Sequence, residues 1–210
     1  PALFEMLLIA AENDTRQLPS SMTNVLLSGD WVGLDLQPRL NALNPSIQLT
    51  ALGGATEAAI WSNAFDVNYV ETDWTSIPYG YSLSNQSYRV MDALGRDCPD
   101  WVIGELWIGG QGVAEGYFAD PERTAAQFIF HDGQQYYRTG DMGRFWSNGI
   151  VEFIGRRDNQ VKLNGFRIEL GDVEHAAEQF SGVQKAIALL LDKPQKHIQL
   201  FVSKQQGEVS

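Results

Sequence analysis

A short strand, a helix and a second short strand follow one another early in the chain, and this order restricts the fold more than any other feature. The three segments are Thr23–Ser28, Leu34–Leu43 and Ile47–Leu52. Such a strand–helix–strand unit is typical of a parallel sheet. Ligands bind these sheets beyond the carboxyl ends of the strands, which predicts a site near residues 28–30 and 53–57.

The pattern changes after Ile77, where short apolar segments alternate with turns rich in Gly, Asn and Asp. Asn148-Gly149 and Asn164-Gly165 are typical of tight hairpin turns. One helix is expected at Pro121–Phe130, with proline suited to its first turn. The remaining segments predict a mostly antiparallel sheet: Gln86–Asp92, Glu105–Ile108, Gln135–Arg138, Gly149–Ile154 and Gln160–Ile168.

A smaller unit is expected from Asp158 onward. A hairpin is followed by a helix at Gly171–Phe180 and by strands at Ala186–Leu191 and His197–Ser203. This segment is short for an independent core. The sequence therefore predicts an α/β chain with a parallel-sheet portion, a mostly antiparallel β portion to residue 157, and the start of a small α+β subdomain at 158–210.

Charge and cysteine content exclude several classes of protein. The formal net charge is −11, which disfavours nucleic-acid binding because the body of the chain repels phosphate backbones. Cys98 is the only cysteine, and there is no apolar segment of membrane-spanning length. We expect a reducing, cytoplasmic location and no membrane partner. The first residue is Pro1, and Pro1–Glu12 has the apolar spacing of a helix, which suggests a piece of a longer protein.

Gly53-Gly54-Ala55-Thr56-Glu57 has the composition of a phosphate-binding loop. Small residues let the backbone approach a ligand, a hydroxyl can meet a phosphate oxygen, and a carboxylate can hold Mg²⁺ between phosphates. In the alternative interpretation, Thr56 caps a helix and Glu57 suits its first turn. Taken alone, the two interpretations have equal weight.

Tyr137-Arg138-Thr139-Gly140-Asp141 ends a predicted strand with a carboxylate. An aspartate there can accept hydrogen bonds from two ribose hydroxyls. The alternative is a turn-forming aspartate, which the residues alone favour. Gly109-Gly110-Gln111-Gly112 lacks the Lys-Ser/Thr of a P-loop, so a tight turn explains it better.

The order of these motifs resembles the later core motifs of adenylation domains of nonribosomal peptide synthetases. The resemblance runs from about Val25 to Glu174 and rests on four segments. Members of this family make an acyl adenylate from a carboxylic acid and ATP, and transfer the acyl group to a carrier-protein thiol. The segments are Gly53–Glu57 (GGATE), Gly104–Tyr117 (GELWIGGQGVAEGY), Tyr137–Asp141 (YRTGD) and Gly155–Glu169 (GRRDNQVKLNGFRIE).

The resemblance implies roles for individual residues. Thr56 would contact phosphate, Glu57 would hold Mg²⁺, and Asp141 would bind the ribose hydroxyls with Arg156 nearby. Asp158 would be the hinge of the small subdomain, and Gly165 would lie in the hairpin presented to the phosphopantetheine arm of a carrier domain. The nucleotide would also lie against Gly53, Gly54 and Ala55, although the family often has an aromatic residue in the place of Gly53.

The resemblance also implies an amino-acid side-chain pocket that suits a small thiol, so L-cysteine is the expected substrate. The most similar family members build thiazoline-type siderophores. A small apolar cavity with one hydroxyl and an indole wall accommodates a polarisable thiol. Its expected lining is Leu26, Ser28, Leu52, Ile60 and Trp61.

Two family motifs do not occur in these 210 residues: the lysine-bearing phosphate loop and the motif with the catalytic lysine. We therefore expect residues 1–210 not to catalyse adenylation efficiently by themselves. Two alternatives stay open at this point. One is a stand-alone acyl or aryl ligase, and the other is a non-catalytic remnant that acts as a scaffold.

Overall fold

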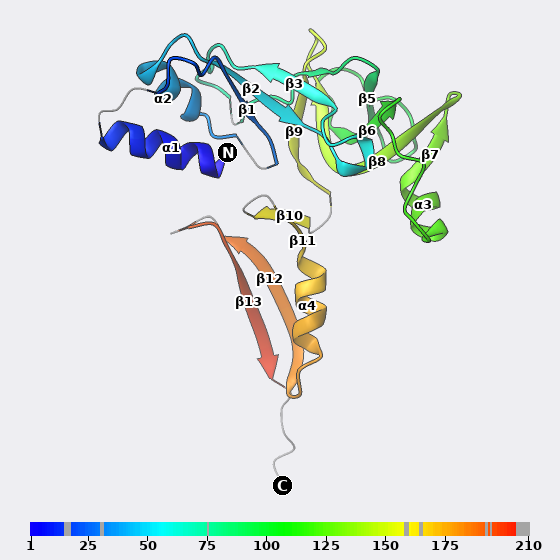
Figure 1. Ribbon diagram of the computed structural model, residues 1–210. Helices are drawn as coiled ribbons and strands as arrows, with labels where there is room; N and C mark the ends of the chain where they lie inside the picture. Colours follow the sequence, from blue (N-terminus) through cyan, green and yellow to red (C-terminus); the bar gives the residue numbers. More distant parts are fainter. Residues whose placement is uncertain are drawn as a thin grey trace. The chain divides into compact units, whose positions relative to one another are not determined.

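The structure is a computed structural model that describes residues 1–14, 18–29, 32–74, 76–157, 160–163, 166–191, 193 and 195–204. The side chains of Gln160 and Arg167 are outside the description. The chain divides into two compact units, Pro1–Arg157 and Asp158–Ser210 (Figure 1). The predicted hinge residue Asp158 and the hairpin residue Gly165 lie outside the described residues. The assignment of the units to a large and a small adenylation subdomain stays a prediction.

The first unit begins with a mixed sheet in the strand order β1-β2-β3-β4. The predicted parallel pair is present, with Leu26 opposite Thr50. The next two strands join antiparallel, so the parallel portion consists of one strand pair. The elements are α1 (Ala2–Asn13), β1 (Asn24–Leu27), α2 (Leu36–Leu43), β2 (Gln48–Gly53), the 3₁₀ helix η1 (Thr56–Ala58), β3 (Asn63–Asp66) and β4 (Tyr81–Ser82).

One face of this sheet is covered by the two helices. Phe4, Leu8 and Ala11 are three or four residues apart on α1 and face inward, because this spacing places them on one side of the helix. Leu36 and Leu40 do the same on α2. These side chains form one core with the alternate residues of β1 and β2, which are Val25, Leu27, Leu49 and Ala51.

The second sheet of this unit is antiparallel, as the sequence predicts. Its order is β5-β6-β8-β7, and β9 also pairs with β8. A bridge between Gly80 and Val151 connects this sheet to the residue just before β4. The elements are β5 (Gln86–Met91), β6 (Gly104–Gly110), α3 (Pro121–Gln127), β7 (Phe128–His131), β8 (Gln134–Phe145) and β9 (Val151–Arg156).

The helix expected at Pro121–Phe130 is shorter than predicted. Asp120 caps it by accepting a hydrogen bond from the Arg123 N–H, and Pro121 stands in its first turn. The helix ends at Gln127 because residues 128–131 pair with β8 instead. Tertiary pairing has outweighed local helix propensity here.

The second unit contains two hairpins and a helix. β10 (Gln160–Leu163) pairs antiparallel with β11 (Phe166–Glu169), and β12 (Val183–Leu191) pairs antiparallel with β13 (His197–Lys204). Helix α4 (Leu170–Glu178) packs on β12 and is tied to it by two hydrogen bonds. The carboxylates of Glu174 and Glu178 accept from the backbone N–H groups of Ala188 and Ala186. The predicted hairpin, helix and two strands are therefore present.

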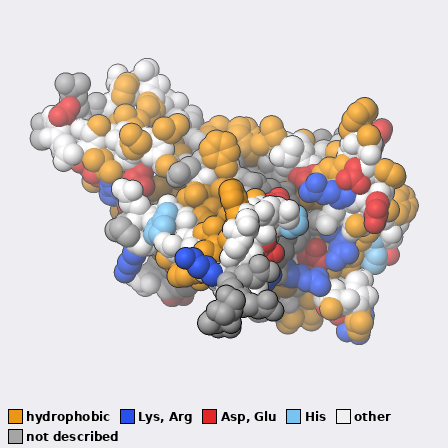
Figure 2. Space-filling view, turned by 90° about the horizontal axis from the view of Figure 1, so that it is seen from below, with side chains coloured by type: hydrophobic (Ala, Val, Ile, Leu, Met, Phe, Trp, Pro, Cys, Tyr) orange, Lys and Arg blue, Asp and Glu red, His pale blue; other side chains and the backbone are white. Residues whose placement is uncertain are grey.

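Figure 2 shows acidic and basic side chains interspersed on the side of the first unit where the antiparallel sheet lies. Arg89 bridges Asp97 and Asp132, and Arg138 pairs with Glu105. The guanidinium of Arg89 lowers the pKa values of both Asp97 and Asp132. In the described ranges, no helix is long and apolar enough to cross a membrane.

We expect Leu106→Ala to destabilise the first unit by about 2–5 kcal/mol, because Leu106 is fully buried on a central strand. The measurement is urea unfolding followed by tryptophan emission, which reports on this unit since all six Trp residues precede residue 158. Leu94→Ala is the control: Leu94 is exposed, so the change should stay within about 0.5 kcal/mol. Equal effects would contradict the burial described above.

Candidate functional site

The loop after β2 has a backbone that only glycine tolerates at Gly54. Its φ is +145°, and a Cβ there would lie 2.6 Å from the Ile60 carbonyl oxygen and 2.7 Å from the Ser62 nitrogen. The loop folds back on itself, because the Ser62 N–H donates to the Gly53 carbonyl. Ala59 and Ile60 also have positive φ. Such strain is often found at functional sites.

The loop continues into η1, which is anchored to the antiparallel sheet. Ala58 is fully buried in the core of that sheet with Leu106 and Val151. Ala55 occupies the N-cap position, so the capping role considered for Thr56 is wrong, and the Thr56 side chain is exposed. The buried Ala58 thus holds Thr56 and Glu57 at the junction of the two sheets.

Glu57 is oriented by Tyr117, a contact that the sequence did not indicate. The Tyr117 hydroxyl donates to Glu57 Oε1 at 2.7 Å. Burial raises the pKa of Tyr117, and the hydrogen bond to Glu57 adds to this effect. Phe128 packs edge-on against the Tyr117 ring, and Arg123 lies over its face. The carboxylate is therefore held by a tyrosine that α3 and β7 fix in place.

Asp141 lies in a bulge in the middle of β8, not at the end of a strand. Trp107 is opposite Arg138, whereas Glu105 is opposite Met142, so β8 has two extra residues at this point. The Thr139 hydroxyl donates to the Leu106 carbonyl at 2.6 Å and accepts from the Asp141 N–H at 2.9 Å. This correction has a clear physical cause, because side-chain hydrogen bonds replace the ladder bonds that the bulge removes.

The bulge is further fixed by Gly140 and Glu105. Gly140 has a φ of +73°, which favours glycine. Its N–H donates to Glu105 Oε1 at 3.3 Å, and Arg138 pairs with the other carboxylate oxygen at 2.9 Å. The turn-forming role that the residues alone favoured for Asp141 is therefore wrong.

Asp141 and Arg156 are cross-strand partners on β8 and β9. Arg156 donates to Asp141 Oδ1 at 2.7 Å, and the two side chains are only 13% and 14% exposed. Low exposure strengthens the Coulombic attraction and adds a desolvation cost, so that removing one partner costs more than it does at the surface. The sequence placed these residues 15 apart, and the structure brings them together.

Buried polar residues connect this ion pair to the loop after β2. Asn63 is opposite Gly53 and donates to the Tyr88 hydroxyl at 3.0 Å. Burial raises the pKa values of Tyr79 and Tyr88, and the charge of Asp141 adds to both shifts. Tyr79 stacks on Phe153 with ring centroids 5.0 Å apart. A small cavity of about 40 Å³ lies here, lined by residues that include Leu52, Gly53, Asn63, Tyr79 and Phe153.

The residues expected to contact a substrate side chain lie on or near one face of the mixed sheet. Leu26, Ser28 and Leu52 share that face, because Leu26 is opposite Thr50 and side chains alternate along each strand. The Trp61 indole N–H donates to Ser28 Oγ at 3.0 Å, which brings β1 and the η1 loop together. Leu26, Ile60 and Trp61 are exposed in the described structure.

A magnesium ion beside the loop after β2 would find the carboxylate of Glu57. Within the described ranges, no group of three or more His, Cys, Asp and Glu side chains could hold a metal. Mg²⁺ commonly binds through one or two carboxylates together with substrate phosphates and water. Glu57 therefore fits an ion shared with a phosphorylated ligand, and does not form a protein cage by itself.

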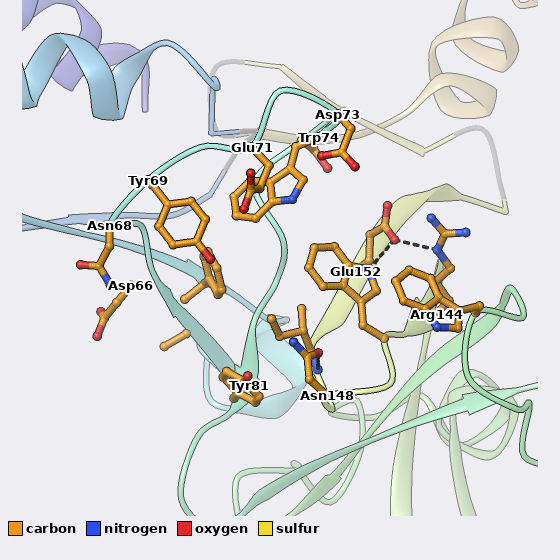
Figure 3. Close-up of a pocket in the computed structure, with 16 residues that line it drawn as sticks. Asp66, Asn68, Tyr69, Glu71, Asp73, Trp74, Tyr81, Arg144, Asn148 and Glu152 are labelled. Carbon is orange, nitrogen blue, oxygen red and sulfur yellow. Dashed lines mark hydrogen bonds and ion pairs between the residues drawn. The ribbon is translucent and has the colours of Figure 1, made fainter.

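A larger cavity of about 840 Å³ is lined by none of the residues that the sequence proposed for the nucleotide, the metal or the amino acid (Figure 3). The strained loop, the bulge and the ion pair thus define the candidate site, and the large cavity has a different lining that shares Ser76 with the small one.

Comparison with known proteins agrees with the motif order. The model of the AMP-binding enzyme family matches residues 1–118. The anguibactin system regulator of Vibrio anguillarum is 54% identical over 202 residues, which cover 96% of this chain and 19% of that protein. Pyochelin synthetase PchE of Pseudomonas aeruginosa is 54% identical over 195 residues, which cover 91% of this chain and 13% of that protein.

Among solved structures, holo-PA1221, a nonribosomal peptide synthetase protein with adenylation and carrier domains, has a TM-score of 0.85 at 26% identity. The match covers 97% of this chain and 36% of that one. This chain therefore spans less than a fifth of the length of both curated relatives.

We expect Arg156→Met to destabilise the first unit by about 1–3 kcal/mol, because it leaves the Asp141 carboxylate without the guanidinium. The double variant Asp141→Asn/Arg156→Met should lose less free energy of unfolding than the two single variants lose together. The difference, measured by urea unfolding, should be at least about 0.5 kcal/mol. The exposed pair of Arg96 and Asp92 is the control and should couple more weakly. Strict additivity at Asp141 and Arg156 would contradict the ion pair.

Proposed function

The chain belongs to the AMP-binding enzyme family, and on this premise we propose that it forms part of an adenylation domain of a nonribosomal peptide synthetase. In the proposed reaction, the carboxylate oxygen of an amino acid attacks the α-phosphorus of ATP. The bond from oxygen to the α-phosphorus forms, the bond to the bridging oxygen breaks, and pyrophosphate leaves. The aminoacyl group then passes to a carrier thiol, and AMP is released.

The observation that carries this proposal is the bulge in β8, which sets Asp141 against Arg156 beside the strained loop after β2. A bulge of this kind redirects a side chain next to a site. The buried Tyr79 lies within the electrostatic reach of both residues of the pair. A nucleotide at this junction would have its sugar near Asp141 and its phosphates toward the loop.

Each part of the site has a proposed role toward ATP. Asp141 accepts hydrogen bonds from the ribose hydroxyls, with Arg156 holding its orientation. Gly53, Gly54 and Ala55 would present their backbone to the nucleotide, in a loop that closes on Ser62 because Gly54 has no Cβ. Thr56 offers an exposed hydroxyl to a phosphate oxygen.

Glu57 is the proposed magnesium ligand. The ion would offset the charge of the phosphates and of the leaving pyrophosphate. Glu57 contributes one carboxylate, and Tyr117 fixes its orientation through the 2.7 Å hydrogen bond. Because a carboxylate that is already oriented loses less entropy on binding the ion, Tyr117 acts as a positioning residue.

We propose L-cysteine as the amino acid. The Trp61 indole and Ser28 form a connected wall with one hydroxyl, and Leu26, Leu52 and Ile60 supply apolar surface around it. A thiol tolerates an apolar wall, whereas a serine hydroxyl buried without partners costs about 1–3 kcal/mol. The relatives that resemble the chain include a pyochelin synthetase, which is consistent with synthesis of a siderophore.

The proposed partners are the other domains of a synthetase, above all a carrier domain with a phosphopantetheine thiol. The hinge role of Asp158 and the carrier-facing role of the hairpin around Gly165 belong to this proposal. Holo-PA1221, which matches this chain in fold, contains adenylation and carrier domains.

The test of catalysis is amino-acid-dependent pyrophosphate exchange in a full-length synthetase that contains these residues. We expect Asp141→Asn to raise the KM for ATP about tenfold to a hundredfold, because charged hydrogen bonds contribute about 1.5–3 kcal/mol. Glu57→Gln should lower kcat and raise the requirement for Mg²⁺. Asp132→Asn is the control, since Asp132 also pairs with an arginine but lies outside the site. Wild-type exchange in both site variants would contradict these roles.

The test of substrate choice compares exchange rates across the common amino acids. We expect Trp61→Ala to weaken cysteine activation and to admit larger apolar amino acids, because it removes one wall of the pocket. Trp101→Ala is a matched control: Trp101 is 50% exposed against 42% for Trp61, and its indole also donates to a serine hydroxyl. A preference of the unmodified enzyme for an aromatic or charged amino acid would refute cysteine and leave the adenylation proposal in place.

A further inference from the structure

A second site is suggested by the cavity of about 840 Å³ in the first unit, which none of the residues proposed for the nucleotide lines (Figure 3). One wall comes from the segment after β3 and carries Tyr69, Glu71, Asp73 and Trp74. The other comes from β8, β9 and the turn between them.

Aromatic rings form a continuous row through this cavity. Trp74 lies at its centre, 6.0 Å from the Tyr69 ring and 6.1 Å from the Trp146 ring. Trp146 in turn stacks on Trp101 with ring centroids 5.8 Å apart. Tyr69 and Trp101, at the two ends of the row, are exposed. The row therefore offers π-faces to a ligand at the surface.

The cavity also has an excess of negative charge. Arg144 is the only cation among the described residues that line it, and it is already paired with Glu152, which also accepts from the Trp146 indole at 2.7 Å. Among the described residues, Glu71 and Asp73 have no ion-pair partner, and both are exposed. Two carboxylates beside the aromatic row are thus available to a cationic ligand.

The cavity already contains one contact between a guanidinium and an indole ring, which is the kind of contact that an arginine of a ligand could make there. The Arg144 guanidinium lies over the Trp101 ring, 5.2 Å from its centroid. Guanidinium groups stack on indole faces and pair with carboxylates at the same time. Figure 3 shows Glu71 and Asp73 beside Trp74. An indole ring and carboxylates are thus combined here as they are around Arg144.

We propose that this cavity binds an arginine-bearing segment of a partner polypeptide, with the guanidinium over Trp74 and between Glu71 and Asp73. Exposed Tyr and Trp residues are the common anchors of protein interfaces. A cavity of about 840 Å³ has room for the residues that flank the arginine as well as for its side chain. The acidic charge of the chain, −11 in total, favours approach of a basic segment.

The experiment titrates the 210-residue chain with two peptides, acetyl-Gly-Arg-Gly-amide and the same peptide with citrulline. Citrulline has nearly the shape of arginine and no charge. Binding is measured by calorimetry and by tryptophan emission, because three Trp residues line the cavity. We expect the arginine peptide to bind at least tenfold more tightly than the citrulline peptide, and its affinity to fall as salt is raised.

The variant Glu71→Gln/Asp73→Asn should lower the affinity for the arginine peptide at least fivefold. The affinity for the citrulline peptide should stay unchanged. Glu5→Gln/Glu122→Gln is the control, since it removes the same charge from exposed residues that do not line the cavity. Because all four residues are exposed, circular dichroism should show unchanged folding. Equal affinity for the two peptides, no effect of the cavity variant, or equal binding of free arginine amide would overturn the proposal.

Discussion

The hydrogen bond from the Thr139 hydroxyl to the Leu106 carbonyl, 2.6 Å long, supports the arrangement of the whole candidate site. It satisfies a buried backbone oxygen on a central strand where the bulge of β8 supplies no N–H, and an unsatisfied buried carbonyl would be costly. The same hydroxyl accepts from the Asp141 N–H. One side chain thus stabilises the bulge and fixes the residue that faces Arg156.

A second constraint acts at the loop after β2. The absence of a side chain at Gly54 lets the loop turn back toward Ser62, and the buried Ala58 ties the loop to the antiparallel sheet. As a result, Glu57 reaches Tyr117 and Trp61 reaches Ser28, although the partners are 60 and 33 residues apart. The proposed phosphate, metal and amino-acid contacts therefore depend on one strained turn.

The two cavities of the first unit differ in chemistry. The small one has an uncharged lining of aliphatic, aromatic and small polar residues near the end of β2, whereas the large one combines four carboxylates with a row of aromatic rings. Arg144, which lines the large cavity, is already paired with Glu152. A nucleotide carries negative charge and is repelled by such a lining, while a cation is attracted. Charge thus disfavours a nucleotide in the large cavity and favours a cation there.

The sequence by itself determined the parallel strand pair, the antiparallel strands after Ile77, the small C-terminal unit and the family, because these depend on local periodicity and on the order of motifs. It did not determine the end of α3, the antiparallel addition of β3 and β4, or the position of Asp141 within a strand. Nor did it indicate that Tyr117 orients Glu57 or that Trp74, Trp101 and Trp146 form one row. These features depend on pairing between distant segments, whose free energy outweighs local preference, and only the tertiary structure decides which partners meet.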